Sequence, residues 1–306
     1  MTAVRRMWAQ RLVAPARDLA GALDDVLALP APNLTAAGLA VRARTTGLTP
    51  GDLRAALAGG EVVRTWAMRG AVHLLRRRDV RWVVALLGPV NAARSARGPA
   101  EAGLDDARCA TVSAAVREVL TEPLTRDGLL DRLAEVGVRL DERQAAPALT
   151  RAAHDGVLCL GESTYHPVPQ EGPEHDVTEL VRRYLRAHGP ATADDFATWS
   201  GLDDERARDA FRRERADGVE PVEAGTVRLL GHSDGFLAGY RDLGLLLDPA
   251  DEPLLRPGGR ALPHVVVDGR VRGTWRRRAG RVVVEQFGHI PAPELDAEVA
   301  SVAEWV

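Results

Sequence analysis

The chain has 306 residues, 45% of them hydrophobic and 27% charged, which is the composition of an ordinary globular protein. That length predicts about two to four compact units. No apolar run approaches the roughly 18 residues of a membrane-spanning helix, residues 1–12 contain no signal-peptide core, and two cysteines are typical of a reducing compartment. We therefore expect a cytoplasmic protein with no metal centre and no cofactor.

Arginine supplies all of the positive side-chain charge, because the 40 basic residues include no lysine. A net charge of −3 argues against a generally basic nucleic-acid-binding protein. The arginines are nevertheless clustered. One cluster comprises Arg64, Arg69, Arg76, Arg77, Arg78, Arg81, Arg94 and Arg97, and a second comprises Arg270, Arg272, Arg276, Arg277, Arg278 and Arg281. Each guanidinium can bind a phosphate through two parallel hydrogen bonds, so each cluster is either a DNA-binding face or a solvated surface.

Two short helices followed by a pair of strands form a pattern that recurs along the chain. Its first copy predicts helices at 34–45 and 52–57, the second of them entered through Thr49 and Pro50. A β-rich segment follows at 62–75, with a bend at Arg69-Gly70.

The second copy predicts helices at 124–137 and 141–156 and a hairpin at 157–168. The third predicts a helix at 191–201 with a Thr192/Asp195 capping pair, a helix at 202–218 and a hairpin at 219–230. Two helices and a two-stranded wing are typical of a winged-helix unit.

After about residue 235 the pattern changes to alternating strands, with a two-residue Asp268-Gly269 turn that favours a hairpin. We expect a small β-barrel-like domain here, finished by a helix at 292–305. The predicted fold class is therefore α+β. The expected domains are a first winged helix with N-terminal helices (1–100), a second winged helix (101–170), a third winged helix (171–235) and the barrel-like domain (236–306).

Four separated segments of the chain resemble the winged-helix DNA glycosylases of the AlkZ and YcaQ type. They are LAVRARTTGLTPGDLRAALAGGEVVRTWAMRGAVHLLRRRDVRWVVALLGP, GPATADDFATWSGL, GYRD and VVVDGRVRGTWRRR. The resemblance covers nearly the whole chain and implies three tandem winged-helix units and a C-terminal β-barrel, C-shaped around a DNA-binding channel. Those relatives excise alkylated purines and unhook interstrand crosslinks.

In that family, a Gln-apolar-Gln or Gln-apolar-Asp triplet just before the helix that reads LAVRAR here positions the water that attacks the sugar carbon. The resemblance places the triplet at Pro30-Ala31-Pro32. Proline offers no side-chain acceptor, no amide donor and no charge, although its fixed φ suits a helix entrance that Asn33 then caps. We therefore expect no catalytic residue. The carboxamide of Asn33 is a weak candidate, and the carboxylates of Asp24 and Asp25 are further groups that catalysis could recruit.

The expected DNA-contacting residues come from both arginine clusters and the first predicted helix. They are Arg42, Arg44, Arg64, Arg69, His73, Arg76, Arg77, Arg78, Arg81, Arg276, Arg277 and Arg278. For Arg42 and Arg69 an internal ion pair is the alternative, and His73 either reaches DNA or ends a buried strand.

Together these features predict a non-catalytic DNA-binding protein on a glycosylase scaffold. It is expected to bind damaged, bent or branched DNA in repair or genotoxin resistance, as a nucleoid-associated monomer. Two alternatives stay open: an active glycosylase that excises alkylated purines or unhooks crosslinks, and a sequence-specific transcriptional regulator. A hydrolase is disfavoured, because GHSDG at 231–235 matches a nucleophile turn but lacks the preceding parallel sheet.

Overall fold

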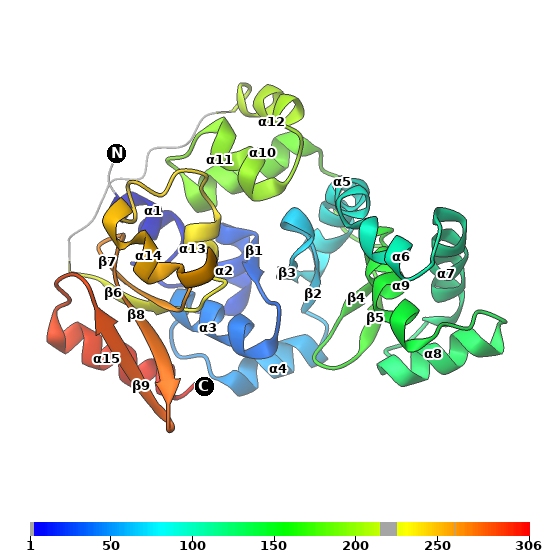
Figure 1. The fold of residues 1–306 in the computed structure, drawn as a ribbon, viewed down its shortest axis with the longest axis horizontal. Coiled ribbons are helices and arrows are strands. Elements are labelled where there is room, and N and C mark those ends of the chain that lie inside the picture. Colours follow the sequence, from blue (N-terminus) through cyan, green and yellow to red (C-terminus); the bar gives the residue numbers. More distant parts are fainter. Residues whose placement is uncertain (1–2, 215–224, 260) are drawn as a thin grey trace. The chain divides into compact units, whose positions relative to one another are not determined.

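The structure is a computed structural model that describes residues 3–214, 225–259 and 261–306. It is a mixed helix and strand fold (Figure 1). Its contacts divide the chain into two units: unit 1 comprises residues 1–53, 181–199 and 204–306, and unit 2 comprises residues 54–180 and 200–203. The four expected domain ranges stay a prediction. Among the described residues, no helix is both long enough and apolar enough to span a membrane.

Unit 1 begins with helices α1 (Ala3–Ala9) and α2 (Leu19–Val26), which strand β1 (Ala28–Pro30) and helix α3 (Leu34–Arg44) follow. Helix α3 begins where predicted because Oδ1 of Asn33 accepts a hydrogen bond from the Ala36 amide at 2.8 Å, which satisfies one of the unpaired donors of the first turn. The later helices are α10 (Val177–His188), α11 (Ala193–Ser200), α12 (Asp204–Phe211), α13 (Gly235–Ala238), α14 (Glu252–Leu255) and α15 (Ala292–Ala303).

The sheet of unit 1 has the strand order β6-β7-β8-β9, and each neighbouring pair is antiparallel. Its strands are β6 (Val227–Leu230), β7 (His264–Val267), β8 (Arg270–Arg278) and β9 (Arg281–Gln286). Asp268 and Gly269 join β7 to β8 with φ values of 48° and 83°. Two consecutive positive φ values are what a two-residue hairpin turn of this kind requires, which confirms that prediction.

The prediction of a C-terminal barrel was wrong, because this sheet is open. Helix α15 packs against both β6 and β9 (Figure 1), so the two edge strands are covered by a helix and do not pair with each other. The predicted hairpin at 219–230 also differs: β6 pairs with β7 and is thus part of this sheet, while residues 219–224 lie outside the described residues.

Unit 2 contains two predicted hairpins in the strand order β3-β2-β4-β5. Strands β2 (Val62–Trp66) and β3 (Val72–Arg76) pair antiparallel around the 3₁₀ turn η1 (Met68–Gly70), and β4 (Leu158–Leu160) pairs with β5 (Tyr165–Pro167). The helices are α5 (Arg77–Ser95), α6 (Arg97–Glu101), α7 (Asp106–Val119), α8 (Arg126–Glu135) and α9 (Glu142–His154), while α4 (Pro50–Ala58) and α10 each cross the boundary between the units.

Helices α7, α8 and α9 share an apolar core that includes Val112, Leu129, Leu133 and Leu149. Helix α5 crosses the C-terminal end of α9 at Gly88, where a Cβ would collide with the backbone carbonyl oxygen of His154. The close approach of these helices therefore depends on the missing side chain of Gly88.

We expect Gly88→Ala to lower the free energy of unfolding by about 1 to 3 kcal/mol, because the added methyl group overpacks the α5–α9 crossing. Urea denaturation followed by circular dichroism measures this change. Gly98→Ala is the matched control, since Gly98 is exposed on α6 and its Cβ would meet nothing closer than 4.0 Å. An equal effect of both substitutions would contradict the role of Gly88.

Candidate functional site

The triplet Pro30-Ala31-Pro32 spans the end of β1 and the approach to α3. Ala31 is fully buried, whereas Pro30 is half-buried and Pro32 is exposed. Side chains of an extended segment alternate between faces, so residues 30 and 32 share one side and Ala31 anchors the other. The backbone keeps an outer-inner-outer arrangement, but the two outer positions carry pyrrolidine rings with no hydrogen-bonding atom.

Two of the three polar groups predicted near the triplet are bound to other groups of the protein. Oδ1 of Asn33 is used as the cap of α3. Asp25 forms an ion pair with Arg11, with 2.7 Å between Oδ2 and Nε. Asp24 lies half-buried on α2.

Gln10 is a carboxamide near the triplet that the sequence did not single out. A Cβ added to Gly235 would lie 3.5 Å from Cδ of Pro30 and 3.8 Å from Oε1 of Gln10. Gln10 is nonetheless 2% exposed, its Oε1 accepts a hydrogen bond from Arg44 at 2.7 Å, and its Nε2 donates to the Ala187 carbonyl at 2.9 Å. Its amide is thus bound inside the protein and does not face solvent.

A buried ion pair joins α3 to the start of α13. The two terminal nitrogens of Arg44 donate to the two carboxylate oxygens of Asp234 at 2.8 and 2.7 Å, and both side chains are almost fully buried. Burial alone would raise the pKa of the Asp234 carboxyl, but the Arg44 guanidinium and the Phe236 amide outweigh burial and hold this pKa below its ordinary value of 3.8. Asp234 belongs to the segment GHSDG at 231–235. Strand β6, which precedes this segment, pairs antiparallel with β7, whereas the nucleophile turn of a hydrolase follows a strand of a parallel sheet.

Several residues expected to contact DNA are buried. Arg42 donates to the Leu229 carbonyl at 2.7 Å and to Glu298 at 3.0 Å, so it forms the internal pair that was the alternative. Arg44 belongs to the buried pair with Asp234. Arg64 is 8% exposed, and desolvation lowers its pKa. The side chain of His73 lies in the protein interior. Its Nδ1 forms a hydrogen bond with the Ala71 carbonyl at 2.8 Å, and burial lowers the pKa of the imidazole to about 4.

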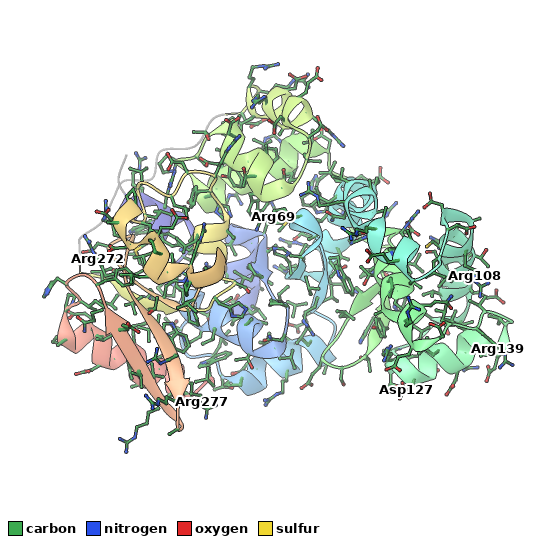
Figure 2. All side chains as sticks on the ribbon, viewed as in Figure 1. Arg69, Arg108, Asp127, Arg139, Arg272 and Arg277 are labelled. Atoms are coloured by element: carbon green, nitrogen blue, oxygen red, sulfur yellow. The ribbon has the colours of Figure 1, made fainter. Side chains whose placement is uncertain are left out.

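Arg69 occupies the turn between β2 and β3 (Figure 2) with a φ of 56°. It is half-buried, and burial together with the neighbouring Arg94 cation lowers its pKa. A non-glycine residue at positive φ in a tight turn is a strained arrangement that the surrounding structure must hold. Arg81 on α5 donates to the Gln170 carbonyl and to Glu174.

The exposed arginines among the residues expected to contact DNA lie in two places. Arg77 and Arg78 are exposed at the start of α5, next to half-buried Arg76 at the end of β3. In unit 1, β7 pairs with β8 only as far as Thr274, so the segment from Arg276 to Arg281 extends beyond β7 as a two-stranded ribbon. We call this segment the arginine ribbon. Arg276, Arg277, Arg278 and Arg281 are exposed on it, and Figure 2 shows Arg277 on the ribbon.

Metal chemistry has no visible support in the described ranges, in which no three His, Cys, Asp or Glu side chains gather into a potential ligand set. Cys109 and Cys159 are both buried as free thiols. The charged groups available to a polyanion are therefore the exposed arginines.

We expect Arg44→Met to lower the free energy of unfolding at pH 7 by about 3 to 5 kcal/mol, because it leaves the buried Asp234 carboxylate without its partner. In the unaltered protein the depressed pKa of Asp234 stabilises the fold above about pH 4, and this contribution is lost as the pH falls below that value. In the variant, Arg44 no longer opposes the effect of burial, so the pKa of Asp234 rises. The loss in free energy of unfolding should therefore be smaller at pH 5 than at pH 7, because the carboxyl takes up a proton. Urea titrations at several pH values test this. Exposed Arg17, replaced by Met, is the control, and a deficit that stays constant with pH would contradict the assignment.

Comparison with known proteins identifies the family of the chain. The chain matches the family model described as DNA glycosylase AlkZ-like over residues 23–305. It is 28% identical to an interstrand DNA cross-link repair glycosylase of Streptomyces sahachiroi, over 79% of this chain and 78% of that protein. Its fold is similar to the solved structure of the Streptomyces sahachiroi DNA glycosylase AlkZ, with a TM-score of 0.80, 24% identity, and coverage of 99% of this chain and 95% of that one. Because the family model matches nearly every residue, the chain belongs to the AlkZ-like DNA glycosylase family.

Proposed function

We propose that this protein is a DNA-binding member of the family that lacks efficient glycosylase activity. Its ligand would be damaged, bent or branched DNA, in repair or genotoxin resistance, and it would act as a monomer at the nucleoid. The observation that carries the proposal is Pro30-Ala31-Pro32, where the family resemblance expects two side chains that hold a water. The relative from Streptomyces sahachiroi is named for repair of interstrand crosslinks, and we extend to this chain the DNA context but not the reaction.

The chemical argument concerns the attacking water. Opening of the glycosidic bond builds positive charge on the sugar, and a carboxamide or carboxylate favours the reaction by accepting a hydrogen bond from the water. Pyrrolidine rings cannot do this. The carboxamide oxygen of Asn33 already caps α3, and the carboxamide of Gln10 is bound to Arg44 and to the Ala187 carbonyl. Loss of a positioned base typically costs a factor of about 10² to 10⁴ in rate.

The binding argument concerns the arginine ribbon and the start of α5. A two-stranded β-ribbon fits the major groove of duplex DNA, and the ribbon carries four exposed guanidinium groups against Glu285, which is 3.4 Å from Arg276. That surface ion pair is weak and exchangeable for a phosphate. Contacts of this type read the position and shape of the DNA backbone more than its sequence, which favours a structural ligand over an operator.

We further propose that three winged-helix units underlie the chain. Helices α3 and α4 precede the β2–β3 hairpin, α8 and α9 precede the β4–β5 hairpin, and α11 and α12 form the third helix pair. This order of elements supports the proposal in the first two copies. The third copy has its helix pair, followed by β6 in the C-terminal sheet.

We expect the purified protein to release alkylated purines from methylated duplex DNA, and to unhook a crosslinked duplex, at least about 100-fold more slowly than the Streptomyces sahachiroi glycosylase, because no residue positions the water. Base release is measured by chromatography, and unhooking on denaturing gels. Rates within tenfold of that enzyme, unchanged in a Pro30→Gln/Pro32→Gln variant, would establish the active-glycosylase alternative. A rate increase in that variant would directly support the proposal that the prolines at residues 30 and 32 are the reason for the slow reaction.

We expect the triple variant Arg276→Ala/Arg277→Ala/Arg278→Ala to weaken DNA binding and to flatten its dependence on salt. Each lost phosphate contact reduces the slope of log K against log salt concentration by about 0.9, so the loss is up to about 2.7 for three contacts. Fluorescence anisotropy with linear, gapped and branched duplexes at several salt concentrations measures both quantities.

The charge-matched control is Arg117→Ala/Arg132→Ala/Arg143→Ala, which removes three exposed arginines from α7, α8 and α9. This control should leave the slope unchanged. An identical slope in both triple variants would exclude the ribbon as the contact surface. Strong dependence on base sequence, with no preference for branched over linear DNA, would favour the transcriptional-regulator alternative.

A further inference from the structure

Residues 170–175, with the sequence QEGPEH, lie against the start of α5 in unit 2. We call them the acidic strap, because they carry two carboxylates, Glu171 and Glu174, and no arginine. Residues 76–81, which include the first turn of α5, carry four arginines and one acid. The strap therefore places negative charge beside one of the two surfaces proposed to bind DNA.

Both ends of the strap are attached to the protein. Before it, Val168 is buried, and its amide donates to the Val157 carbonyl at 3.2 Å. After it, Asp176 caps α10 and accepts a hydrogen bond from the Thr178 amide at 2.9 Å. A strap that leaves α5 thus stays close to it, and its return is an intramolecular step.

The strap follows one side of α5. Gly172 has a φ of 125°, and a Cβ there would collide with the backbone carbonyl oxygen of Arg78. The ring of His175 stands edge-on to that of Trp82, with 5.2 Å between the ring centroids. Arg78 and Trp82 are four residues apart and hence on the same side of the helix. The close approach at Arg78 requires a glycine, both for its positive φ and for its missing side chain.

Arg81, on the same side of α5, holds the strap at two points. Its Nη1 donates to the Gln170 carbonyl at 3.2 Å, and its Nη2 donates to Oε1 of Glu174 at 3.1 Å. The side chains of Arg81 and Glu174 are 42% and 85% exposed, so water and salt weaken this pair. A phosphate that binds Arg81 through both terminal nitrogens competes for these two bonds. The strap thus occupies a guanidinium through contacts that a polyanion can replace.

We propose that the acidic strap is an internal competitor of DNA, which occupies Arg81 in the free protein and moves off α5 when a DNA phosphate takes its place. The proposal rests on the DNA-binding function proposed above. Glu171 and Glu174 repel a phosphate backbone while the strap is in place. Residues 170–174 are exposed, so little buried surface is lost when the strap moves. The strap therefore lowers the affinity for DNA by the free energy needed to displace it.

The first test removes the charge of the strap. In fluorescence anisotropy titrations at about 0.1 M salt, we expect Glu171→Gln/Glu174→Gln to bind duplex DNA at least about threefold more tightly than the unaltered protein. Glu118→Gln/Glu122→Gln removes the same charge from exposed positions at and just after the end of α7. Because salt screens charges more than about 10 Å apart, this control should leave the affinity within about 1.5-fold.

The second test leaves the charge unchanged. Gly172→Ala adds a methyl group where the strap meets the Arg78 carbonyl, so the strap should detach and DNA should bind at least about twofold more tightly. Gly103→Ala is the control, because Gly103 also has a positive φ, of 77°, but a Cβ there would meet nothing within 4 Å. The control should leave the affinity unchanged.

A spin label reports on the strap directly. Cys109 and Cys159 are both buried, so a label attached through Pro173→Cys reacts at an exposed residue of the strap. We expect the electron paramagnetic resonance spectrum to show a more mobile label when DNA is added. Without DNA, the label should also become more mobile when Glu174→Gln is introduced.

These measurements separate the two proposals. If the unaltered protein binds no DNA, the proposed function fails, and the strap proposal fails with it. If the protein binds DNA, three results would each overturn the strap proposal alone. They are an effect of Glu171→Gln/Glu174→Gln no larger than that of its control, an effect of Gly172→Ala no larger than that of Gly103→Ala, and a label mobility that DNA leaves unchanged.

Discussion

The buried pair of Arg44 and Asp234 is the interaction on which unit 1 most depends. Charges this far from water persist only when each has a partner and its hydrogen bonds are satisfied. Arg44 is in the last turn of α3, Asp234 caps α13, and Gln10, directly after α1, completes the arrangement. Segments that are distant in the sequence are thus fixed around the helix that follows the triplet. The scaffold beside the motif is held by groups other than the motif itself, so two prolines can occupy residues 30 and 32 without loss of the surrounding fold.

A set of basic side chains that is entirely arginine can serve two different purposes. A guanidinium is planar, always charged and able to donate in a fork, so it fits a buried carboxylate as well as a phosphate. Arg42 and Arg44 show the first use, since each is bound to an acid inside unit 1. The arginine ribbon has the exposure that the proposed second use requires, since its side chains are exposed beyond the last residue that β7 pairs. A count of arginines along the sequence does not separate these uses, because burial decides between them.

Local signals were sufficient to predict much of the chain. Asn33 as a cap, the Asp268-Gly269 turn and the Thr192/Asp195 capping pair each depend on neighbours within three residues, and the structure has all of them. Pairings between distant residues were not predictable in this way. The sequence gives no signal that Arg44 meets Asp234, that β6 joins β7, or that α15 covers the sheet edges that a barrel would have closed. The position of the triplet came from family resemblance, and its burial pattern came only with the structure.

The contact between α5 and α9 in unit 2 is another pairing of residues that are distant in the sequence. Gly88 permits the end of α9 to approach α5 so closely that the His154 carbonyl occupies the space of a side chain. The His154 ring lies beside Ser95, which is about two helical turns beyond Gly88 on α5. Two features that look unrelated in the sequence, a glycine within a helix and a histidine at the end of another, therefore form one structural element.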